Sequence, residues 1–263
     1  MIRIVTIESL TAPGEDARGA VLVAGSHGGR IAGWYGARAA AHALILNDAG
    51  VGMDRAGIAA LPMLDAIGMA AATVSHASAR IGDGADMLAR GIISHANLHA
   101  ARVGVAAGQS CAEAAGRLVR ATPAHAALSE QAEGRLLLAP GPLAVLGLDS
   151  IGMLRPEDAG RILVIGSHGA LHGGRPETAL GVAARAAVFN DAGIGADRIG
   201  ITRLPALDAR AIPGATVDCM SARIGDCRSM WAGGVISHLN RTASDRGARV
   251  GESVAAFAAR FFA

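Results

Sequence analysis

Short apolar runs rich in Val, Ile and Leu alternate along the chain with longer segments of helical periodicity. The runs are too short for ordinary helices and lack polar alternation, which is typical of strands buried on both faces of a sheet. Strands that alternate with helices favour right-handed crossovers and a mainly parallel sheet covered by helices on both faces. In the first half of the chain the strands are predicted at 2–7, 19–25, 42–47, 70–75 and 91–94.

Helices are predicted between these strands, at 36–43, 54–68 and 110–121. The first is rich in Ala, the residue with the highest helix propensity. The third begins with Ser110 and Glu113 at the spacing of a capping box. Each half of the chain therefore has the element pattern of an α/β lobe.

The same sequence pattern occurs twice. NDAGVGMDRAG at 47–57 matches NDAGIGADRIG at 190–200 in eight of eleven positions, 143 residues further along. SARIGD at 78–83 recurs unchanged at 221–226 with the same offset. A repeat of this length is typical of domain duplication and not of a short solenoid unit.

We therefore predict two tandem homologous lobes, each a mainly parallel sheet flanked by helices, related by a pseudo-twofold axis. The first α/β repeat is expected at 1–122 and the second at 143–263. The segment 123–142 has no counterpart in either repeat, and its Pro, Ser and charge content indicates a connection that is helical in part.

Composition and charge exclude several classes of protein. All 24 basic residues are arginine, so no lysine is present for a Schiff base, a Ser-Lys dyad or a phosphate-binding P-loop. The formal net charge is +2 and no run of like charge occurs, which argues against a nucleic-acid partner.

The expected location is the cytoplasm. Three cysteines without a C-x-x-C pair favour a reduced setting. Glu8 interrupts the first apolar stretch, and no stretch reaches the roughly 18 apolar residues that a membrane span requires. We expect a soluble protein without a secretion signal or a membrane partner.

Polar motifs follow the predicted strands, at the edge of an open parallel sheet where ligands usually bind. Histidine and aspartate are suited to proton transfer, and the arginine fork is suited to a carboxylate. The predicted catalytic residues are His27, Asp48, His95, His168, Asp191, His238 and Cys219. The predicted substrate-binding residues are Ser26, Asn47, Ser78, Arg80, Ser167, Asn190, Ser221 and Arg223.

These motifs also have structural interpretations. Glycine-flanked Ser-His pairs can form tight turns between strand and helix, Asp54 and Asp197 can cap helices, and Arg80 and Arg223 can form salt bridges with an opposing Asp. Two histidines with an Asp could bind a divalent metal, but the spacing fits no metal motif. No cofactor is therefore predicted, and a divalent metal remains an alternative.

One position differs between the repeats in a way that affects the chemistry. His76 in TVSHASARIGD is replaced by Cys219 in TVDCMSARIGD. A thiol close to arginine and imidazoles is expected to have a lowered pKa and to serve as a nucleophile. The structural alternative is a small, buried core residue.

Together these features favour a small-molecule enzyme, with hydrolysis of an amide, imide or ester bond in a small anionic metabolite as the leading hypothesis. A lyase that acts beside a carboxylate, with or without a metal ion, is the first alternative. A non-catalytic protein that binds an anionic ligand is the second. The Ala-rich apolar faces also favour a homo-oligomer, in which the polar residues at the strand ends would be structural.

Overall fold

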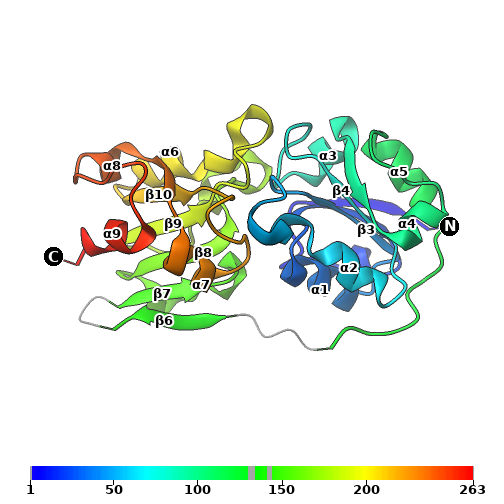
Figure 1. The fold of residues 1–263 in the computed structure, drawn as a ribbon, viewed down its shortest axis with the longest axis horizontal. Coiled ribbons are helices and arrows are strands. Elements are labelled where there is room, and N and C mark those ends of the chain that lie inside the picture. The colour runs from blue at the N-terminus through cyan, green and yellow to red at the C-terminus, as the bar shows by residue number, and fades with distance from the viewer. Residues whose placement is uncertain (1, 130–133, 141–143, 263) are drawn as a thin grey trace. The chain divides into compact units, whose positions relative to one another are not determined.

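The computed structural model describes residues 2–129, 134–140 and 144–262, and shows a mixed α/β protein with two compact units (Figure 1). Each unit contains a mostly parallel sheet flanked by helices. Unit 1 comprises residues 1–51, 55–131 and 195–197, and unit 2 comprises 52–54, 132–194 and 198–263. This confirms the mixed α/β class and the two lobes with mostly parallel sheets that the sequence predicted.

The sheet of unit 1 has the strand order β1-β2-β3-β4-β5. The first four strands run parallel, and β5 pairs antiparallel with β4. The carboxyl ends of the parallel strands therefore meet at one edge of the sheet. The strands are β1 Ile4–Ile7, β2 Val21–His27, β3 Ala43–Asn47, β4 Ala71–Val74 and β5 Ile93–Ala96.

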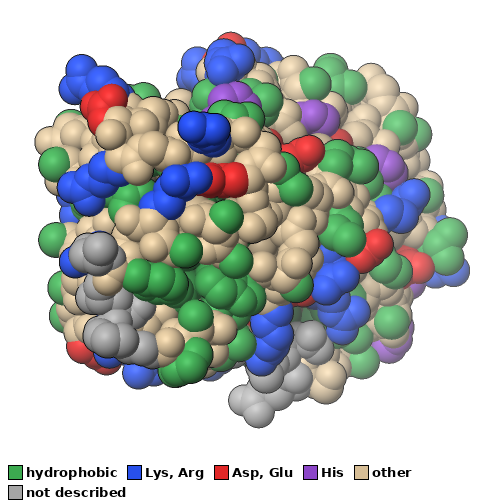
Figure 2. Space-filling model, turned by 60° about the vertical axis from the view of Figure 1, so that its left-hand side comes forward, with side chains coloured by type: hydrophobic (Ala, Val, Ile, Leu, Met, Phe, Trp, Pro, Cys, Tyr) green, Lys and Arg blue, Asp and Glu red, His purple; other side chains and the backbone are tan. Residues whose placement is uncertain are grey.

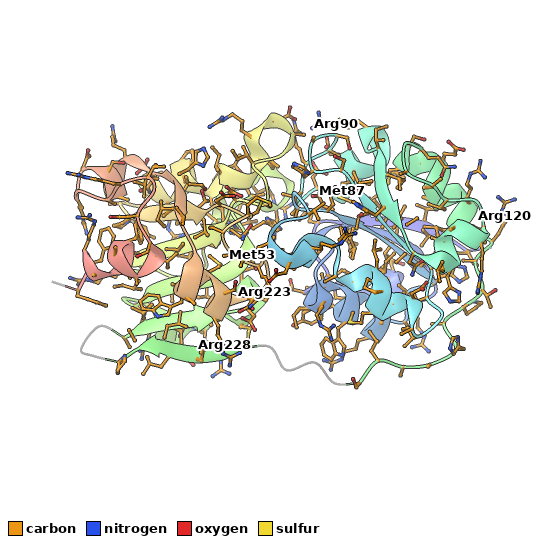
Figure 3. The ribbon with its side chains drawn as sticks, in the orientation of Figure 1. Met53, Met87, Arg90, Arg120, Arg223 and Arg228 are labelled. Atoms are coloured by element: carbon orange, nitrogen blue, oxygen red, sulfur yellow. The ribbon has the colours of Figure 1, made fainter. Side chains whose placement is uncertain are left out.

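Helices cover both faces of this sheet (Figure 1). Ala32 of α1 and Leu61 of α2 belong to one buried apolar cluster, and Met87 of α3 and Leu118 of α5 belong to the other. Figure 3 shows Met87 directed toward the sheet and Arg90, one turn later, directed outward. The helices are α1 Arg30–Arg38, α2 Ala60–Asp65, α3 Gly84–Arg90, α4 Leu98–Arg102 and α5 Cys111–Leu118.

The first helix begins earlier than the sequence predicts, at Arg30, because packing outweighs intrinsic propensity there. A Cβ atom at Gly33 would lie 2.7 Å from the Cβ of Ala60, and one at Gly36 would lie 2.3 Å from a methyl carbon of Leu44. Glycine at these positions allows α1 to lie close to α2 and β3, although it lowers the helix propensity on which the prediction relied.

The sheet of unit 2 has the strand order β11-β10-β9-β8-β7-β6. The strands β7 to β10 run parallel, whereas β6 and β11 are antiparallel to their neighbours. The segment 123–142, which we expected to be partly helical, instead supplies β6 in its described part. The strands are β6 Arg135–Ala139, β7 Val145–Leu148, β8 Ile162–His168, β9 Ala186–Asn190, β10 Gly214–Val217 and β11 Ile236–Leu239.

Helices also lie on both faces of the second sheet. Leu207 of α6 packs in one apolar cluster with Phe189, and Met230 of α7 packs in the other with Phe257 of α9. Among the described residues, no helix is both long enough and apolar enough to cross a membrane. The helices are α6 Arg203–Asp208, α7 Cys227–Gly233, α8 Arg241–Ser244 and α9 Val254–Ala259.

A buried arginine holds the irregular segment that follows β8. Arg203 is 0% exposed, and its Nη1 donates to the carbonyls of Thr178 and Ala179, while Nε donates to the carbonyl of His168 at 3.3 Å. Its guanidinium carbon lies 5.0 Å from the centre of the Phe189 ring. Burial lowers the pKa of Arg203 to about 9. Carbonyl oxygens thus provide the hydrogen bonds that a buried arginine requires.

We predict that Gly57→Ala lowers the free energy of unfolding by about 1–3 kcal/mol, the usual cost of overpacking a buried site. A Cβ atom there would lie 2.0 Å from the carbonyl oxygen of Asp48, and a backbone atom cannot easily move away. The matched control is Gly116→Ala in α5, where the new Cβ would meet nothing within 4 Å. That variant should gain about 0.5–1 kcal/mol through helix propensity. Urea denaturation measures both, and a Gly57→Ala variant as stable as the wild type would contradict the packing argument.

Candidate functional site

Polar residues at the ends of three neighbouring strands gather at one edge of the sheet of unit 1. His27 is the last residue of β2, Asp48 directly follows β3, and His76 is the second residue after β4. The strand register pairs His27 with Asn47, and Asn47 with Val74. Two histidines and one aspartate are therefore brought to the same edge.

Asp48 holds His76 through one carboxylate oxygen. Oδ1 of Asp48 accepts the main-chain N–H of His76 at 2.9 Å and also lies 2.9 Å from its Nδ1. The Asp48 side chain is 4% exposed and the His76 side chain is 29% exposed. When Nδ1 donates to the carboxylate, Nε2 is the nitrogen that can accept a proton. The pair has the geometry of an oriented general base.

Opposing effects set the ionisation of Asp48. Burial raises its pKa, but the hydrogen bonds and charge of His76 and a hydrogen bond from Ser94 outweigh burial and hold the pKa below its ordinary value of 3.8. Asp48 is therefore ionised at neutral pH. Its negative charge stabilises the positive charge that His76 acquires when it takes up a proton.

The backbone after β3 is shaped around this carboxylate. Ala49, Gly50 and Val51 have φ angles of 49°, 77° and 62°. In this left-handed turn the N–H of Gly50 donates to Oδ1 of Asp48 at 3.1 Å, and the N–H of Val51 donates to the Asp48 carbonyl at 2.7 Å. A β-branched residue in this region is strained, and such strain is concentrated at functional sites.

His27 is buried and is held in one tautomer. Its Nδ1 accepts the N–H of Gly29 at 3.1 Å, so the proton of the neutral ring is on Nε2. Burial lowers the pKa of His27 to about 4. At neutral pH His27 is therefore a hydrogen-bond donor through Nε2 and not a base that titrates near pH 7.

The two asparagines predicted to bind substrate form hydrogen bonds with the backbone. The amide nitrogen of Asn47 donates to the carbonyl of Ala79 at 3.4 Å, and its oxygen accepts the N–H of Ala49 at 2.9 Å. Asn190 makes the same two bonds to the corresponding alanines of unit 2, at 3.3 and 2.9 Å. Both are fully buried, at 0% exposure.

The predicted serines are also bound to the backbone. The hydroxyl of Ser78 donates to the carbonyl of Ser75 at 2.8 Å and accepts the N–H of Ile92 at 2.9 Å. The hydroxyl of Ser26 accepts the N–H of Leu10 at 2.9 Å. Their counterparts Ser167 and Ser221 make the corresponding bonds in unit 2. These hydroxyls connect loops, which favours the structural interpretation of the motifs.

Each predicted arginine has a carboxylate beside it. Nε of Arg80 lies 2.8 Å from Asp197, and its Nη1 lies 3.8 Å from Asp86. Nη1 of Arg223 lies 2.8 Å from Asp54, and its Nε lies 3.1 Å from Asp226. Both side chains are 43% exposed, so a ligand anion would compete with an existing exposed ion pair, which is a weak interaction. Figure 2 shows arginines interspersed with acidic and apolar side chains on the face it presents.

The other predicted histidines have different surroundings. Nδ1 of His95 is buried without a hydrogen-bond partner among the described residues. Nδ1 of His238 lies 3.3 Å from the hydroxyl of Ser237. His168 is buried beside His172, with ring centres 5.6 Å apart. The carboxylate of Asp48 thus contacts a histidine outside the predicted set.

Unit 2 has the corresponding carboxylate but no corresponding imidazole. Oδ1 of Asp191 accepts the N–H groups of Gly193 and Cys219, each at 3.0 Å. Burial raises the pKa of Asp191, and the hydrogen bonds of Gly193, Ser237 and Cys219 do not offset burial. The charge of Asp218 raises the pKa further. The two equivalent aspartates therefore shift in opposite directions.

Cys219 does not have the lowered pKa expected from the sequence. Burial, together with the negative charges of Asp191 and Asp218, raises the pKa of this thiol to about 12. The thiol is protonated at neutral pH, which argues against a thiolate nucleophile. Asp191, Asp218 and Cys219 each offer a ligand atom, all within 4.8 Å of one another, and these three residues could hold a divalent cation.

His76 is a candidate site residue that the predicted set does not include. Apart from Cys219, the predicted set was chosen from motifs shared by the two halves, and at this differing position only the cysteine of the second half was included. The sequence signal that could have identified His76 was its position two residues after β4, the strand that pairs with β3, which Asp48 follows.

Comparisons with protein-family models, with curated proteins and with solved structures find no match for this chain. The function is therefore inferred from the geometry of the site itself.

We predict that Asp48→Asn and Asp191→Asn change the pH dependence of stability with opposite signs. The pKa of Asp48 is lowered in the fold, so Asp48 contributes stability above its unfolded pKa and loses it as the pH falls through its folded pKa. The pKa of Asp191 is raised, so its ionisation costs stability as the pH rises through its folded pKa, and the cost is absent below its unfolded pKa.

The measurement is chemical denaturation of the wild type and both variants from neutral pH to about pH 3, a range that brackets ordinary carboxyl pKa values. As the pH falls, the free energy of unfolding of the wild type should decrease relative to that of Asp48→Asn. Relative to that of Asp191→Asn, it should increase. Parallel curves for the two variants would contradict the assigned shifts.

Proposed function

We propose that the protein is a hydrolase of an amide, imide or ester bond in a small anionic metabolite, with its active site at the strand ends of unit 1. The observation that carries the proposal is the buried Asp48 carboxylate, which orients the partly exposed imidazole of His76 at 2.9 Å. A buried carboxylate that orients an accessible imidazole is a common arrangement for general-base catalysis.

In the proposed reaction, Nε2 of His76 takes a proton from a water molecule as the water oxygen bonds to the substrate carbonyl carbon. The charge on the imidazolium is stabilised by Asp48. His76 then returns the proton to the leaving nitrogen or oxygen as the scissile bond breaks, so that the base is regenerated. Water is the nucleophile because the hydroxyl of Ser78 is bound to backbone groups and the thiol of Cys219 is protonated.

His27 and Arg80 have supporting roles in this proposal. The neutral Nε2–H of His27 suits a hydrogen bond to the oxygen on which negative charge develops. Arg80, which is 43% exposed, suits the anionic group of the substrate after exchange of its contacts with Asp197 and Asp86. These assignments give a role to both the buried, neutral imidazole of His27 and the ionised carboxylate of Asp48 at the same edge of the sheet.

We also propose that the two halves arose by duplication and are related by a pseudo-twofold axis. The recurrence of SARIGD and the matching bonds of Asn47 and Asn190 support this origin. Because Cys219 replaces His76, unit 2 does not retain the same base. Self-association through the Ala-rich faces remains a prediction.

A metal-dependent lyase is the second candidate, and the cluster of Asp191, Asp218 and Cys219 favours it. A cation bound there would require the thiolate form of Cys219 and would offset the repulsion between the two carboxylates. Elemental analysis of the purified protein before and after dialysis against a chelator tests this candidate. About one divalent ion per chain, lost in an Asp218→Asn variant, would support it.

We predict that His76→Gln and Asp48→Asn each lower kcat by about 10²–10⁴-fold, the usual contribution of general-base catalysis. The assay follows hydrolysis of a panel of monoamides, cyclic imides and monoesters of small dicarboxylic acids. Cys219→Ala is the matched control, since it changes the equivalent position of unit 2, and it should retain wild-type kcat. Substrate hydrolysis that is unchanged in both the His76 and Asp48 variants would remove the pair from the mechanism.

A further inference from the structure

A cavity of about 630 Å³ lies in unit 1 at the opposite edge of the sheet from the Asp48 and His76 pair. Three of its lining residues, Gly19, His42 and Met69, stand just before β2, β3 and β4. The cavity therefore lies at the amino ends of these strands. β3 has five residues, which corresponds to about 16 Å of extended chain between the two edges.

The wall of the cavity is mostly apolar. Trp34 of α1, Ile67, Met69 and Leu128 provide the large apolar side chains, and alanines fill much of the remainder. A cavity of this volume with a mainly apolar lining and few polar groups is typical of small-molecule sites. Trp34 lines the cavity and is only partly buried against the core.

Two polar side chains of the lining give the cavity its chemical character. His42 is 7% exposed, and its Nε2 has no hydrogen-bond partner among the described residues. A buried polar atom without a partner is costly, and a ligand atom would satisfy it. The guanidinium of Arg38 lies 5.1 Å from the centre of the Trp34 ring and is exposed.

The charged side chains in the cavity wall determine which ligand charge is favoured. Arg38 is positively charged, and no carboxylate occurs among the lining residues, all of which belong to the described part of the chain. A negatively charged group is therefore favoured near Arg38, and an apolar or aromatic body is favoured against Trp34. A cationic ligand is disfavoured.

We propose that this cavity is a binding site for a small aromatic carboxylate, whose ring lies against Trp34, whose carboxylate pairs with Arg38 and which forms a hydrogen bond with Nε2 of His42. The site is separate from the proposed hydrolytic site and does not depend on it. It gives the protein a second ligand, bound at the amino edge of the same sheet.

The test uses 4-nitrobenzoate as the probe and the quenching of tryptophan fluorescence by its nitroaromatic ring as the readout. The chain has two tryptophans, and only Trp34 lines the cavity, so the full-length Trp231→Phe variant reports on the site alone. We expect saturable quenching in Trp231→Phe. In Trp34→Phe, which retains Trp231, we expect no more than the linear quenching given by free tryptophan.

Arg38→Gln should weaken 4-nitrobenzoate about tenfold, the effect of losing one charge-assisted hydrogen bond, and should leave the neutral 4-nitrobenzamide unchanged. Arg102→Gln, which removes an exposed arginine outside the cavity, is the matched control and should bind both probes like the parent protein. His42→Phe should weaken both probes. Because this buried substitution can disturb folding, its circular dichroism is compared with that of the parent. The comparison of the two probes on Arg38→Gln tests the proposal independently of His42→Phe.

Two results would overturn the proposal. One is the absence of saturable quenching of Trp34 at millimolar probe. The other is an equal loss of 4-nitrobenzoate binding in Arg38→Gln and Arg102→Gln, which would show attraction by net charge and not by this site. Neither result depends on the hydrolytic activity.

Discussion

The arrangement at the strand ends of unit 1 depends on one buried carboxylate. An ionised Asp48 in the interior must be supplied with hydrogen bonds, because an unsatisfied buried charge is far more costly than an unsatisfied neutral group. Its Oδ1 receives the N–H of Gly50, the N–H of His76 and Nδ1 of His76. These bonds join the turn after β3 to the loop after β4. The orientation of His76 is thus a consequence of satisfying Asp48.

Unit 2 contains the equivalent carboxylate, Asp191, without a neighbouring imidazole. Asp191 receives equivalent backbone bonds, yet its pKa is raised while that of Asp48 is lowered. The difference follows from the neighbours, because the ring and the main chain of His76 form hydrogen bonds with Asp48, whereas Cys219 has no ring donor and Asp218 adds a negative charge beside Asp191. Two differences on a similar backbone, Cys219 in place of His76 and Asp218 in place of Ser75, therefore shift the pKa values of the two carboxylates in opposite directions.

The sequence was sufficient for the elements but not for the contacts of the site. The apolar runs predicted the strands of unit 1 to within about two residues, and Ser110 accepts the N–H of Glu113 as half of the expected capping box. The start of α1 was missed because Gly33 and Gly36 pack in the core. The roles of the predicted asparagines and serines depend on neighbours distant in sequence, such as Ala79 for Asn47, and no local pattern indicates whether an amide binds a ligand or a loop.

Positions that are identical in the two halves have a different use from positions that differ. The identical ones maintain the turns and the loop connections. Asn47 and Ser78 recur because both units need the same turns and the same loop connections, and their side chains are used for that purpose in each unit. A position can change only where the backbone does not depend on its side chain. In both units Asp48 or Asp191 binds the main-chain N–H of the residue at this position, which any residue but proline supplies. The side chain of residue 76 is thereby free to differ between the units, and the proposed reaction depends on this difference between His76 and Cys219 and not on the identical motifs around it.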